Sequence, residues 1–398
     1  LLITILLAFF IAFSEEIKLN EEHNYFEITE KTEGDFSFIN NSSEIRTQIV
    51  KTKEGEFVKL IVNGYSFNSF FGKPELPVLK KLFRIPSGGQ VVVKIINKEE
   101  QLISLDDYNI IFPLFPNQPS ISKGDNAKQV PFIYDRDFYK INQFNENPIV
   151  KIDVLGKMRG QEMARLNISP FSYNPVTNEL KIITKIEAKV VFKNADLAED
   201  LSIRKKYFNP NFEHQYKQFV NYLPLPTKDV ITTYPVKYVI ISDPMFQSIL
   251  QPFVEWKVKK GFEVIEGYTN DPVVGNTTTS IRSFIKTMYD NATVNDPAPT
   301  YLLIVGDEAQ VPSFNGNSGT HISDMYYCEM DGGGDFYPEM YYGRFSATMP
   351  EELTPQILKT LEYEKYTMPD PSYLDEVVMV AGVDASMAPT YGNGQINY

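Results

Sequence analysis

The stretch "VKYVIISDPMFQSILQPFVEWKVKKGFEVI", residues 236–265, reads as a strand, a helix and a second strand. Its first residues form a continuous apolar run, which is typical of a buried strand. Asp243 and Pro244 supply an N-cap and a first-turn proline for a helix that ends at Gly261. One face of this helix carries its apolar side chains: Phe246, Leu250, Phe253 and Val254. A strand, a helix and a strand in this order indicate a parallel α/β sheet.

The same alternation continues toward the end of the chain. The polar start "NTTTS" leads into a helix with Ile281, Phe284, Ile285 and Met288 on one face, and the strand "YLLIVGD" then runs to Asp307. Thr348 and Glu351 have the spacing of a capping box. The apolar face of the helix that follows comprises Leu353, Ile357, Leu358 and Leu361. "EVVMVAGVD" predicts a further buried strand that ends at Asp384, so we expect an α/β domain with a mainly parallel sheet.

Residues from about 20 to 220 have a different pattern. Short β-branched and aromatic runs, such as "EFVKLIVNGYSF", "QVVVKIIN" and "ELKIITKIEAKVVF", alternate with Pro, Gly and Asn. Period-2 alternation at these intervals predicts a mostly antiparallel β domain, either a sandwich or a barrel. Helical periodicity is nearly absent there. The boundary between the two domains lies near residues 223–235, where three prolines stiffen an exposed link.

The first residues, "LLITILLAFFIAFSEE", are an apolar run followed by carboxylates. The run is about thirteen residues long, too short to span a bilayer, and fits the apolar part of a secretory signal. We assign residues 1–14 to a signal peptide remnant; the alternative is a buried N-terminal strand or helix. No initiator methionine or basic start precedes the run, so we expect a piece of a longer exported protein with no membrane span in its mature form.

The bulk composition excludes several classes of protein. The chain has 398 residues, 43% hydrophobic and 22% charged, which is ordinary for a globular protein of two or three domains. Its net charge of −13 would repel phosphate backbones and anionic lipids, so nucleic acid and membrane surfaces are poor partners. A single cysteine, Cys328, rules out a disulfide framework within the chain.

The stretch "MDGGGDFYPE" gathers three acidic residues on a glycine-rich loop: Asp331, Asp335 and Glu339. Ligands in open α/β sheets bind beyond the carboxyl ends of the strands, where Asp307 and Asp384 each end a strand. We therefore interpret the loop together with Asp307. Oxygen ligands without a nearby Cys or His pair favour calcium over zinc, although the spacing is not that of an EF-hand. The alternatives are a solvated acidic hairpin and, for each strand-end aspartate, a helix cap or turn.

Few side chains could act as a nucleophile or a soft metal ligand. His23, His214 and His321 are the only histidines, and the first two precede the α/β domain. Cys328 activated by His321 is conceivable, but a small buried thiol is the commoner role for such a cysteine. No "GxSxG", "GxxxxGK" or "HExxH" motif occurs, which disfavours the α/β-hydrolase fold, P-loop proteins and zincins.

Several strings occur in the order found in one known family. "VKYVIISDPMFQSILQPFVEWKVKKGFEV", "YLLIVGDEAQVP", "DFYPEMYYGRFSATMPEEL" and "YEKYTMPDPSYLDEVVMVAGVD" resemble the start of the catalytic domain of gingipains, which are exported bacterial cysteine endopeptidases. The lysine-specific type is the more similar. Upstream, "GKPELPVLKKLFRIPSG" and "RLNISPFSYNPVTNELKI" are similar to the β-rich propeptide of the same family. The resemblance implies a propeptide at residues 15–228 and part of a caspase-like peptidase domain at 229–398.

The resemblance also implies site residues. The structural calcium site of the family falls on Asp307, Asp335, the carbonyl of Tyr337 and Glu339, with Asp331 as a further ligand, although two extra glycines separate the aspartates here. The catalytic acid of the family falls on Asp384, where a carboxylate would orient a histidine that pairs with a cysteine thiolate. That histidine and that cysteine are expected beyond Tyr398, so this chain alone is expected to be inactive.

The resemblance implies protein or peptide substrates, cleaved after basic residues, and a propeptide that acts as an intramolecular inhibitor. Lys123 or Lys128 could enter the primary pocket, and Lys228 would suit a maturation cut in the proline-rich link. Two other readings stay open. One is an exported, non-catalytic calcium-binding adhesion module, and the other is a calcium-independent structural surface protein.

Overall fold

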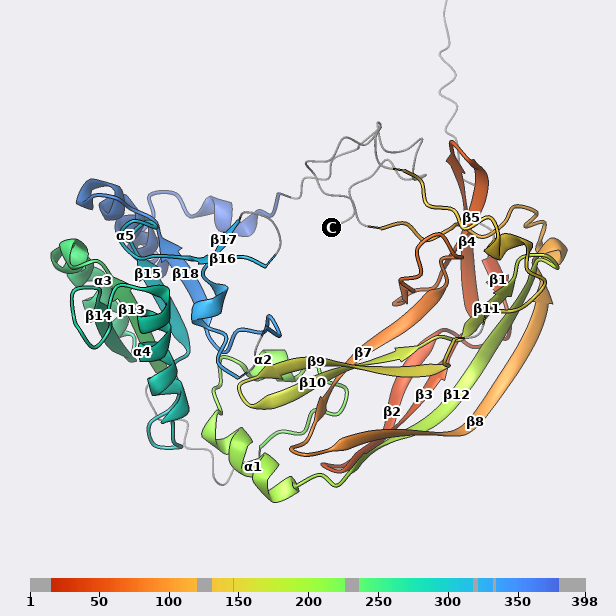
Figure 1. Cartoon of the computed structure of the whole chain (residues 1–398), viewed down its shortest axis with the longest axis horizontal. Helices are drawn as coiled ribbons and strands as arrows, with labels where there is room; N and C mark the ends of the chain where they lie inside the picture. The colour runs from red at the N-terminus through yellow and green to blue at the C-terminus, as the bar shows by residue number, and fades with distance from the viewer. Residues whose placement is uncertain are drawn as a thin grey trace, which may run out of the picture.

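The computed structural model describes residues 16–119, 131–145, 147–225, 236–317, 321–331 and 334–378. Within them the chain forms a β-rich part followed by an α/β part, as the sequence predicts (Figure 1). Several predicted features lie outside the described residues: the signal remnant at 1–14, the lysines proposed for inhibition or processing (Lys123, Lys128 and Lys228) and the catalytic acid Asp384.

The β-rich part consists of antiparallel strands, which confirms the predicted class. Its strands are β1 (Glu16–Lys18), β2 (Tyr25–Lys31), β3 (Asp35–Asn41), β4 (Glu44–Thr52), β5 (Gly55–Ile61), β6 (Ser66–Phe67), β7 (Pro77–Ile85), β8 (Gln90–Ser104), β9 (Val150–Met158), β10 (Gln161–Ile168), β11 (Phe171–Asn174) and β12 (Glu179–Lys193). They form three sheets, ordered β1-β4-β5, β6-β7-β10-β9 and β11-β12-β3-β2, and β8 also pairs with β12.

The long strand β12 organises the cores of this part, because its inward side chains contribute to two of them. Near its C-terminal half, apolar residues of β3 and β12 pack against those of β7 and β10, so two sheets lie face to face as a sandwich. Near its N-terminal half, β12 and β11 pack against the sheet of β1, β4 and β5. Of the two predicted arrangements, sandwich or barrel, the β-rich part forms the sandwich.

Two helices follow the last strand of the β-rich part and were not predicted. They are α1 (Leu197–Lys206) and the single turn α2 (Glu213–Tyr216). The Asp196 side chain caps α1 by accepting the N–H groups of Ala198 and Glu199. The helix lacks a clear apolar stripe, because charged residues fill half of its positions, and this explains why its periodicity is not visible in the sequence.

The α/β part matches the predicted order of elements closely. It comprises β13 (Val236–Ser242), α3 (Gln247–Lys259), β14 (Phe262–Tyr268), α4 (Thr278–Asp290), β15 (Tyr301–Val305), β18 (Tyr341–Phe345) and α5 (Pro350–Lys365). Shorter elements are the hairpin β16 (Phe314–Asn315) and β17 (Ile322–Ser323), and 3-10 turns such as η4 (Pro244–Phe246) and η5 (Met325–Tyr327). Among the described residues, β14, β13, β15 and β18 form a parallel sheet in this order.

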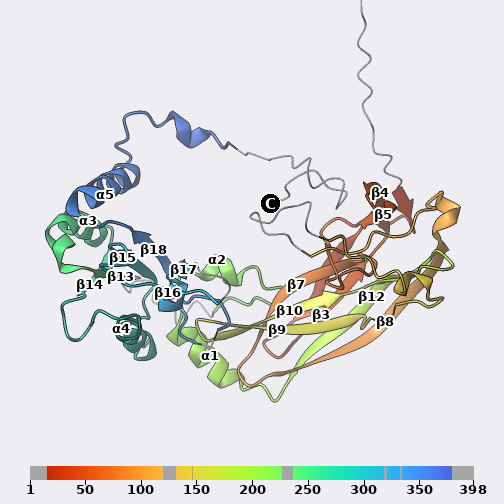
Figure 2. The same ribbon diagram turned by 45° about the horizontal axis from the view of Figure 1, so that its top comes forward.

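Helices cover both faces of this sheet (Figure 2). The apolar face of α4 packs on one side of β13 and β15, together with Tyr327 and Cys328. The apolar faces of α3 and α5 pack on the other side, where all four core residues predicted for the first helix are buried, Phe246 in η4 and the other three in α3. Asp243 accepts the N–H of Met245 at 2.9 Å and so caps the turn that leads into α3, as predicted.

Three details of the prediction near α5 and after it are wrong. Thr348 bonds Glu352, not Glu351, because the helix begins one residue later than expected, with Pro350 as its first residue. Leu358 is 56% exposed, because the apolar stripe of α5 is narrower than the sequence pattern suggests. The buried strand expected from residue 376 does not form at 376–378, where no neighbouring strand covers the valines; its remainder lies outside the described residues.

Within the described residues, no helix is both long and apolar enough to cross a membrane.

Candidate functional site

The two parts of the chain meet at the turn of the β9–β10 hairpin, which extends toward the α/β part in Figure 1. β9 ends at Met158 and β10 begins at Gln161, so Arg159 and Gly160 alone make the turn. Both have positive φ, 49° for Arg159 and 74° for Gly160, as a type I′ turn requires. This region costs an L-residue such as arginine on the order of 1 kcal/mol. Contacts of the arginine side chain must therefore offset that cost.

The Arg159 side chain is fully buried, with 0% exposure, between the two parts. Its Nη1 donates to the carbonyl oxygens of Pro299 and Glu339, at 2.9 Å each, in the α/β part. Its Nε donates to the carbonyl of Tyr207 at 3.1 Å, and its guanidinium lies 4.9 Å from the ring centre of Phe212. Nη2 has no partner among the described residues. A buried cation thus joins the two parts.

Three acidic side chains of the α/β part lie beside this turn, namely Asp331, Asp335 and Glu339, here called the acidic cluster. The backbone N–H of Gly160 donates to Asp331, and that of Lys157 donates to Asp335 at 2.7 Å. These charge-assisted hydrogen bonds are stronger than neutral ones. The structure therefore brings three of the predicted calcium ligands together and attaches the β-rich part to two of them.

Close packing supports the same contact. A Cβ on Gly156 would lie 2.5 Å from the Cβ of Asp335, so no side chain fits at position 156. Around the turn, the ring of Tyr207 stacks on Tyr289 with centroids 4.7 Å apart, and the hydroxyl of Tyr289 donates to Asp331 at 2.9 Å. Aromatic pairs of this kind add stability beyond the area that they bury. The hairpin is therefore fitted to the surface that it touches.

Glu339 is the most unusual acid of the cluster, because its side chain is fully buried. Burial and, to a smaller extent, the negative charges of Asp331 and Asp335 together raise its pKa to about 8, against a hydrogen bond from the N–H of Met330. Oε2 accepts that bond at 2.5 Å, whereas Oε1 has no partner in the described part of the chain. An orphaned carboxylate oxygen among like charges is what a cation would satisfy. The chemistry of the cluster therefore fits a hard cation such as calcium.

Asp307 does not share this site. The strands β15 and β18 pair in parallel, so their first residues lie at the same edge of the sheet. Glu339 precedes β18 and therefore lies at the amino edge. Asp307 follows β15 at the carboxyl edge, where its N–H donates to the carbonyl of Ala347. The strands between the two edges span at least about 13 Å. Tyr337 lies in the loop, where its N–H donates to Asp335 at 3.1 Å. Among the described residues, no three His, Cys, Asp or Glu side chains are already arranged as a metal site.

A crevice of about 370 Å³ opens at the carboxyl edge, beyond β13, β14 and β15. Its polar lining comprises Asp243, Thr269, Asn270, Asn276, Glu308 and Gln310. β14 and β15 lie on opposite sides of β13, so this edge is the topological switch point of the sheet, where open α/β sheets bind ligands. The hairpin therefore holds the sheet at the edge opposite to the one where such sheets carry their chemistry.

Cys328 is not poised to act as a nucleophile. It is fully buried in the core under α4, and burial raises the pKa of its thiol well above the ordinary range, as do Glu339 and Asp324. No hydrogen bond joins it to His321 in the described part of the chain, where the ring of His321 lies against Gly316. The structure supports the interpretation of Cys328 as a core residue.

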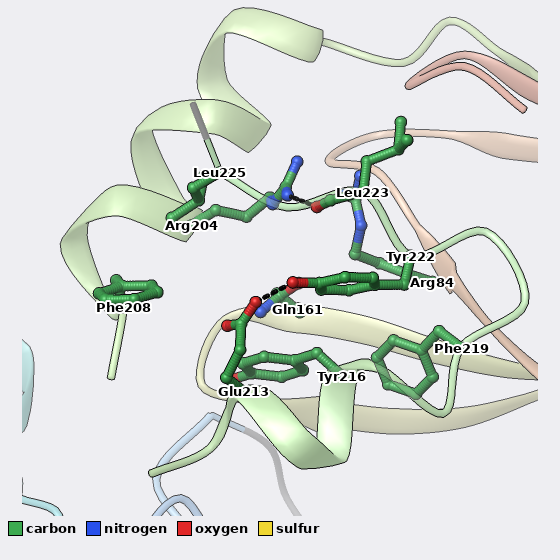
Figure 3. Close-up of a pocket in the computed structure, with 10 residues that line it drawn as sticks. All are labelled: Arg84, Gln161, Arg204, Phe208, Glu213, Tyr216, Phe219, Tyr222, Leu223 and Leu225. Carbon is green, nitrogen blue, oxygen red and sulfur yellow. Dashed lines mark hydrogen bonds between the residues drawn. The ribbon is translucent and has the colours of Figure 1, made fainter. Parts of the chain in front are cut away.

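A small pocket at the end of the β-rich part is lined in part by the first residues of the predicted link, Leu223 and Leu225 (Figure 3). Arg204 donates to the carbonyl of Leu223 at 2.5 Å, and it shares the carboxylate of Glu33 with Arg84. Arg84 also makes two 2.6 Å bonds to Asp200, and its side chain is only 5% exposed. The bond from Arg204 therefore holds the start of the predicted link against the β-rich part.

The sequence alone does not single out Arg159, the residue at the centre of the contact. "RG" separates two runs with strand-like alternation, "VKIDVLGKM" and "QEMARLNI". A two-residue loop that contains glycine is a hairpin signal, so the turn itself could have been predicted. The partner of its side chain lies 180 residues later, at Glu339, and no local pattern reports that.

Comparison with known proteins identifies both parts. Residues 37–222 match the family model "Propeptide_C25", and residues 231–396 match "Peptidase family C25". Lys-gingipain of Porphyromonas gingivalis is 37% identical over 369 residues, which cover 91% of this chain and 21% of that protein. Gingipain R1 of Porphyromonas gingivalis is 27% identical over 331 residues, 82% of this chain and 32% of that protein.

One similar solved structure is described as "Structural insight into zymogenic latency of gingipain K from Porphyromonas gingivalis". It is 34% identical, with a TM-score of 0.44, and the match covers 46% of this chain and 100% of the chain in that structure. This chain spans about a fifth of the length of the Lys-gingipains. The family models, the order of the two segments and the identity to Lys-gingipain agree. The chain belongs to the gingipain family of cysteine endopeptidases, peptidase family C25, and carries the propeptide of that family ahead of peptidase-domain sequence.

Proposed function

We propose that this chain is part of an exported proenzyme whose peptidase domain hydrolyses peptide bonds after basic residues, and whose propeptide keeps it latent. The observation that carries the proposal is the buried Arg159 contact, by which the propeptide segment closes on the peptidase segment. An ordinary linker between independent modules would not need an arginine in a left-handed turn with its charge buried in the neighbouring domain. Lysine is the first specificity to test, because identity is higher to Lys-gingipain than to gingipain R1.

The roles of individual residues follow from this proposal. Asp384 would fix the tautomer of a histidine and stabilise its cationic form, while the histidine takes the proton of a cysteine thiol that attacks the peptide carbonyl. Lys123 or Lys128 of the propeptide would occupy the primary pocket, and cleavage near Lys228 would separate the two parts. The pocket in Figure 3 supports that cut, because Leu223 and Leu225 line it and the β-rich part therefore holds the described chain until shortly before Lys228.

The test is hydrolysis of short lysyl and arginyl peptide substrates by the full-length protein after maturation. Asp384→Asn is expected to lower kcat by about 10⁴-fold, as loss of the orienting carboxylate does in other triads. Cys328→Ala is the matched control and is expected to retain activity, because that thiol is buried in the core. Absence of hydrolysis by the matured wild-type protein would favour the non-catalytic adhesion module.

We further propose that the acidic cluster binds a structural calcium ion, with Asp331, Asp335, Glu339 and the carbonyl of Tyr337 as ligands. Support comes from the unpaired Oε1 of Glu339 and from the mutual repulsion of the three carboxylates. A bound divalent cation would neutralise that repulsion and tie the loop to the start of β18. This role is structural, and the cation takes no part in peptide hydrolysis.

Calcium is expected to raise the melting temperature of the wild-type chain, because a ligand that binds only the folded state stabilises it by about 2.7 kcal/mol at a hundredfold excess over Kd. Asp335→Asn is expected to remove most of that shift. Asp307→Asn is the control and should keep it, since Asp307 lies at the opposite edge of the sheet. The measurement is thermal unfolding in EDTA and in calcium; equal loss of the shift in both variants would contradict the assignment.

A further inference from the structure

We propose that a divalent cation and the turn of the propeptide hairpin compete for the acidic cluster, so that loading the cluster with the cation weakens propeptide docking. The inference rests on the proposed calcium site and goes beyond it, because it links that site to the release of the propeptide. It concerns the amino edge of the sheet and is independent of which residue fills the primary pocket.

The first reason is the charge of Arg159. Its guanidinium is fully buried and bonds only carbonyl oxygens, and in the described residues it makes no ion pair within 4.0 Å. The acidic cluster lies beside it, because Glu339 supplies one of the carbonyls and the N–H of the next residue, Gly160, donates to Asp331. Arg159 thus places a positive charge next to this site. A divalent ion placed there would add two positive charges close to a buried one, where water screens them poorly.

The second reason is that the hairpin already uses the oxygens that a cation needs. Oδ2 of Asp331 accepts from Gly160 and from the hydroxyl of Tyr289, and Oδ2 of Asp335 accepts from Lys157. Each donated N–H reduces the electron density that a carboxylate can offer to a metal ion. Ligation would pull these oxygens toward the ion and lengthen the bonds to the hairpin. Charge and hydrogen bonding therefore act in the same direction.

The consequence is a reciprocal coupling. If the docked hairpin lowers the affinity for the cation, the cation lowers the affinity for the hairpin by the same factor. Before the protein meets calcium, the propeptide would hold the cluster and satisfy its charge. After it meets calcium, the ion would take over that role, and the loop would stay ordered without the propeptide.

The first test measures calcium affinity of the whole chain by titration calorimetry. Arg159→Gln is expected to bind calcium on the order of tenfold to hundredfold more tightly than the wild type. Lys151→Gln is the matched control, because it removes a positive charge from the same hairpin at a side chain that is 64% exposed; its affinity is expected to stay within about threefold of the wild type. Unchanged or weaker binding by Arg159→Gln would overturn the competition.

The second test needs no variant and so does not depend on the folding of one. Amide hydrogen exchange of Lys157 and Gly160, which donate to the cluster, is followed in the wild-type chain with and without saturating calcium. Faster exchange in calcium supports the competition, and equal or slower exchange overturns it. Failure of the wild-type chain to bind calcium overturns the calcium site and the competition together, whereas binding without any effect of Arg159→Gln overturns only the competition.

Discussion

Replacing Glu339 by glutamine is expected to stabilise the cation-free chain at pH 8 by on the order of 4 kcal/mol. In the folded protein burial raises the pKa of this carboxyl from its ordinary 4.5 to about 8. Between these two values the unfolded chain releases the proton and the folded chain keeps it, so the free energy of unfolding falls by about 1.4 kcal/mol per pH unit. The contribution of Glu339 is thus fully present below about pH 4.5 and is lost as the pH rises to about 8.

The measurement is urea-induced unfolding in EDTA at pH 5 and at pH 8. The wild type should lose several kcal/mol more than Glu339→Gln over this interval, because glutamine has no proton to lose. Glu362→Gln is the control, since Glu362 is an exposed residue of α5, and it should follow the wild type. Parallel profiles for the wild type and Glu339→Gln would show that the buried carboxyl is already ionised at low pH.

The layers of the α/β part could be predicted because local signals and burial agree there. Asp243 and Pro244 mark the start of the first helix, and apolar residues recur at helical spacing until Gly261. When capping residues and periodicity agree in this way, few other secondary structures fit the segment. By contrast, α1 carries too many charged residues to show a stripe, and it forms because Asp196 caps it.

The site was harder to predict, because it depends on which edge of a sheet a loop occupies. The sequence predicts that Asp307 and the acidic loop lie together, because both are close to strand ends. Asp307 follows a strand, however, and the loop precedes a parallel one, so the two lie at opposite edges. The direction of the parallel strands alone implies this result. Arg159 depends on a contact between parts far apart in sequence, which no periodicity reports.

Replacing Arg159 by alanine is expected to weaken the hold of the propeptide on the peptidase part by at least about a hundredfold, or 2.7 kcal/mol. The change removes two charge-assisted hydrogen bonds between the parts, each worth roughly 1.5–3 kcal/mol, and leaves the carbonyls of Pro299 and Glu339 unpaired. It also removes the group that offsets the strain of the turn. Loss of the contact should free the hairpin while the sandwich behind it stays folded, since its cores do not involve Arg159.

Arg136→Ala is the matched control for this variant. Arg136 is also an arginine of the propeptide, but its side chain is 62% exposed and pairs with Glu54 within the same part. An exposed pair of this kind contributes little. Binding by Arg136→Ala is therefore expected to equal that of the wild type. A comparable loss in both variants would mean that the effect of Arg159→Ala comes from general destabilisation of the propeptide.

The propeptide is expected to be held to the peptidase part through the buried Arg159 and not only through the covalent link. The most direct measurement cuts the chain at a protease recognition sequence inserted between residues 226 and 235, in EDTA, and follows the two pieces by size-exclusion chromatography at about micromolar concentration. We predict that the wild-type pieces elute together and that the Arg159→Ala pieces elute apart. Wild-type pieces that separate at once, or Arg159→Ala pieces that stay together as firmly as the wild type, would contradict the account.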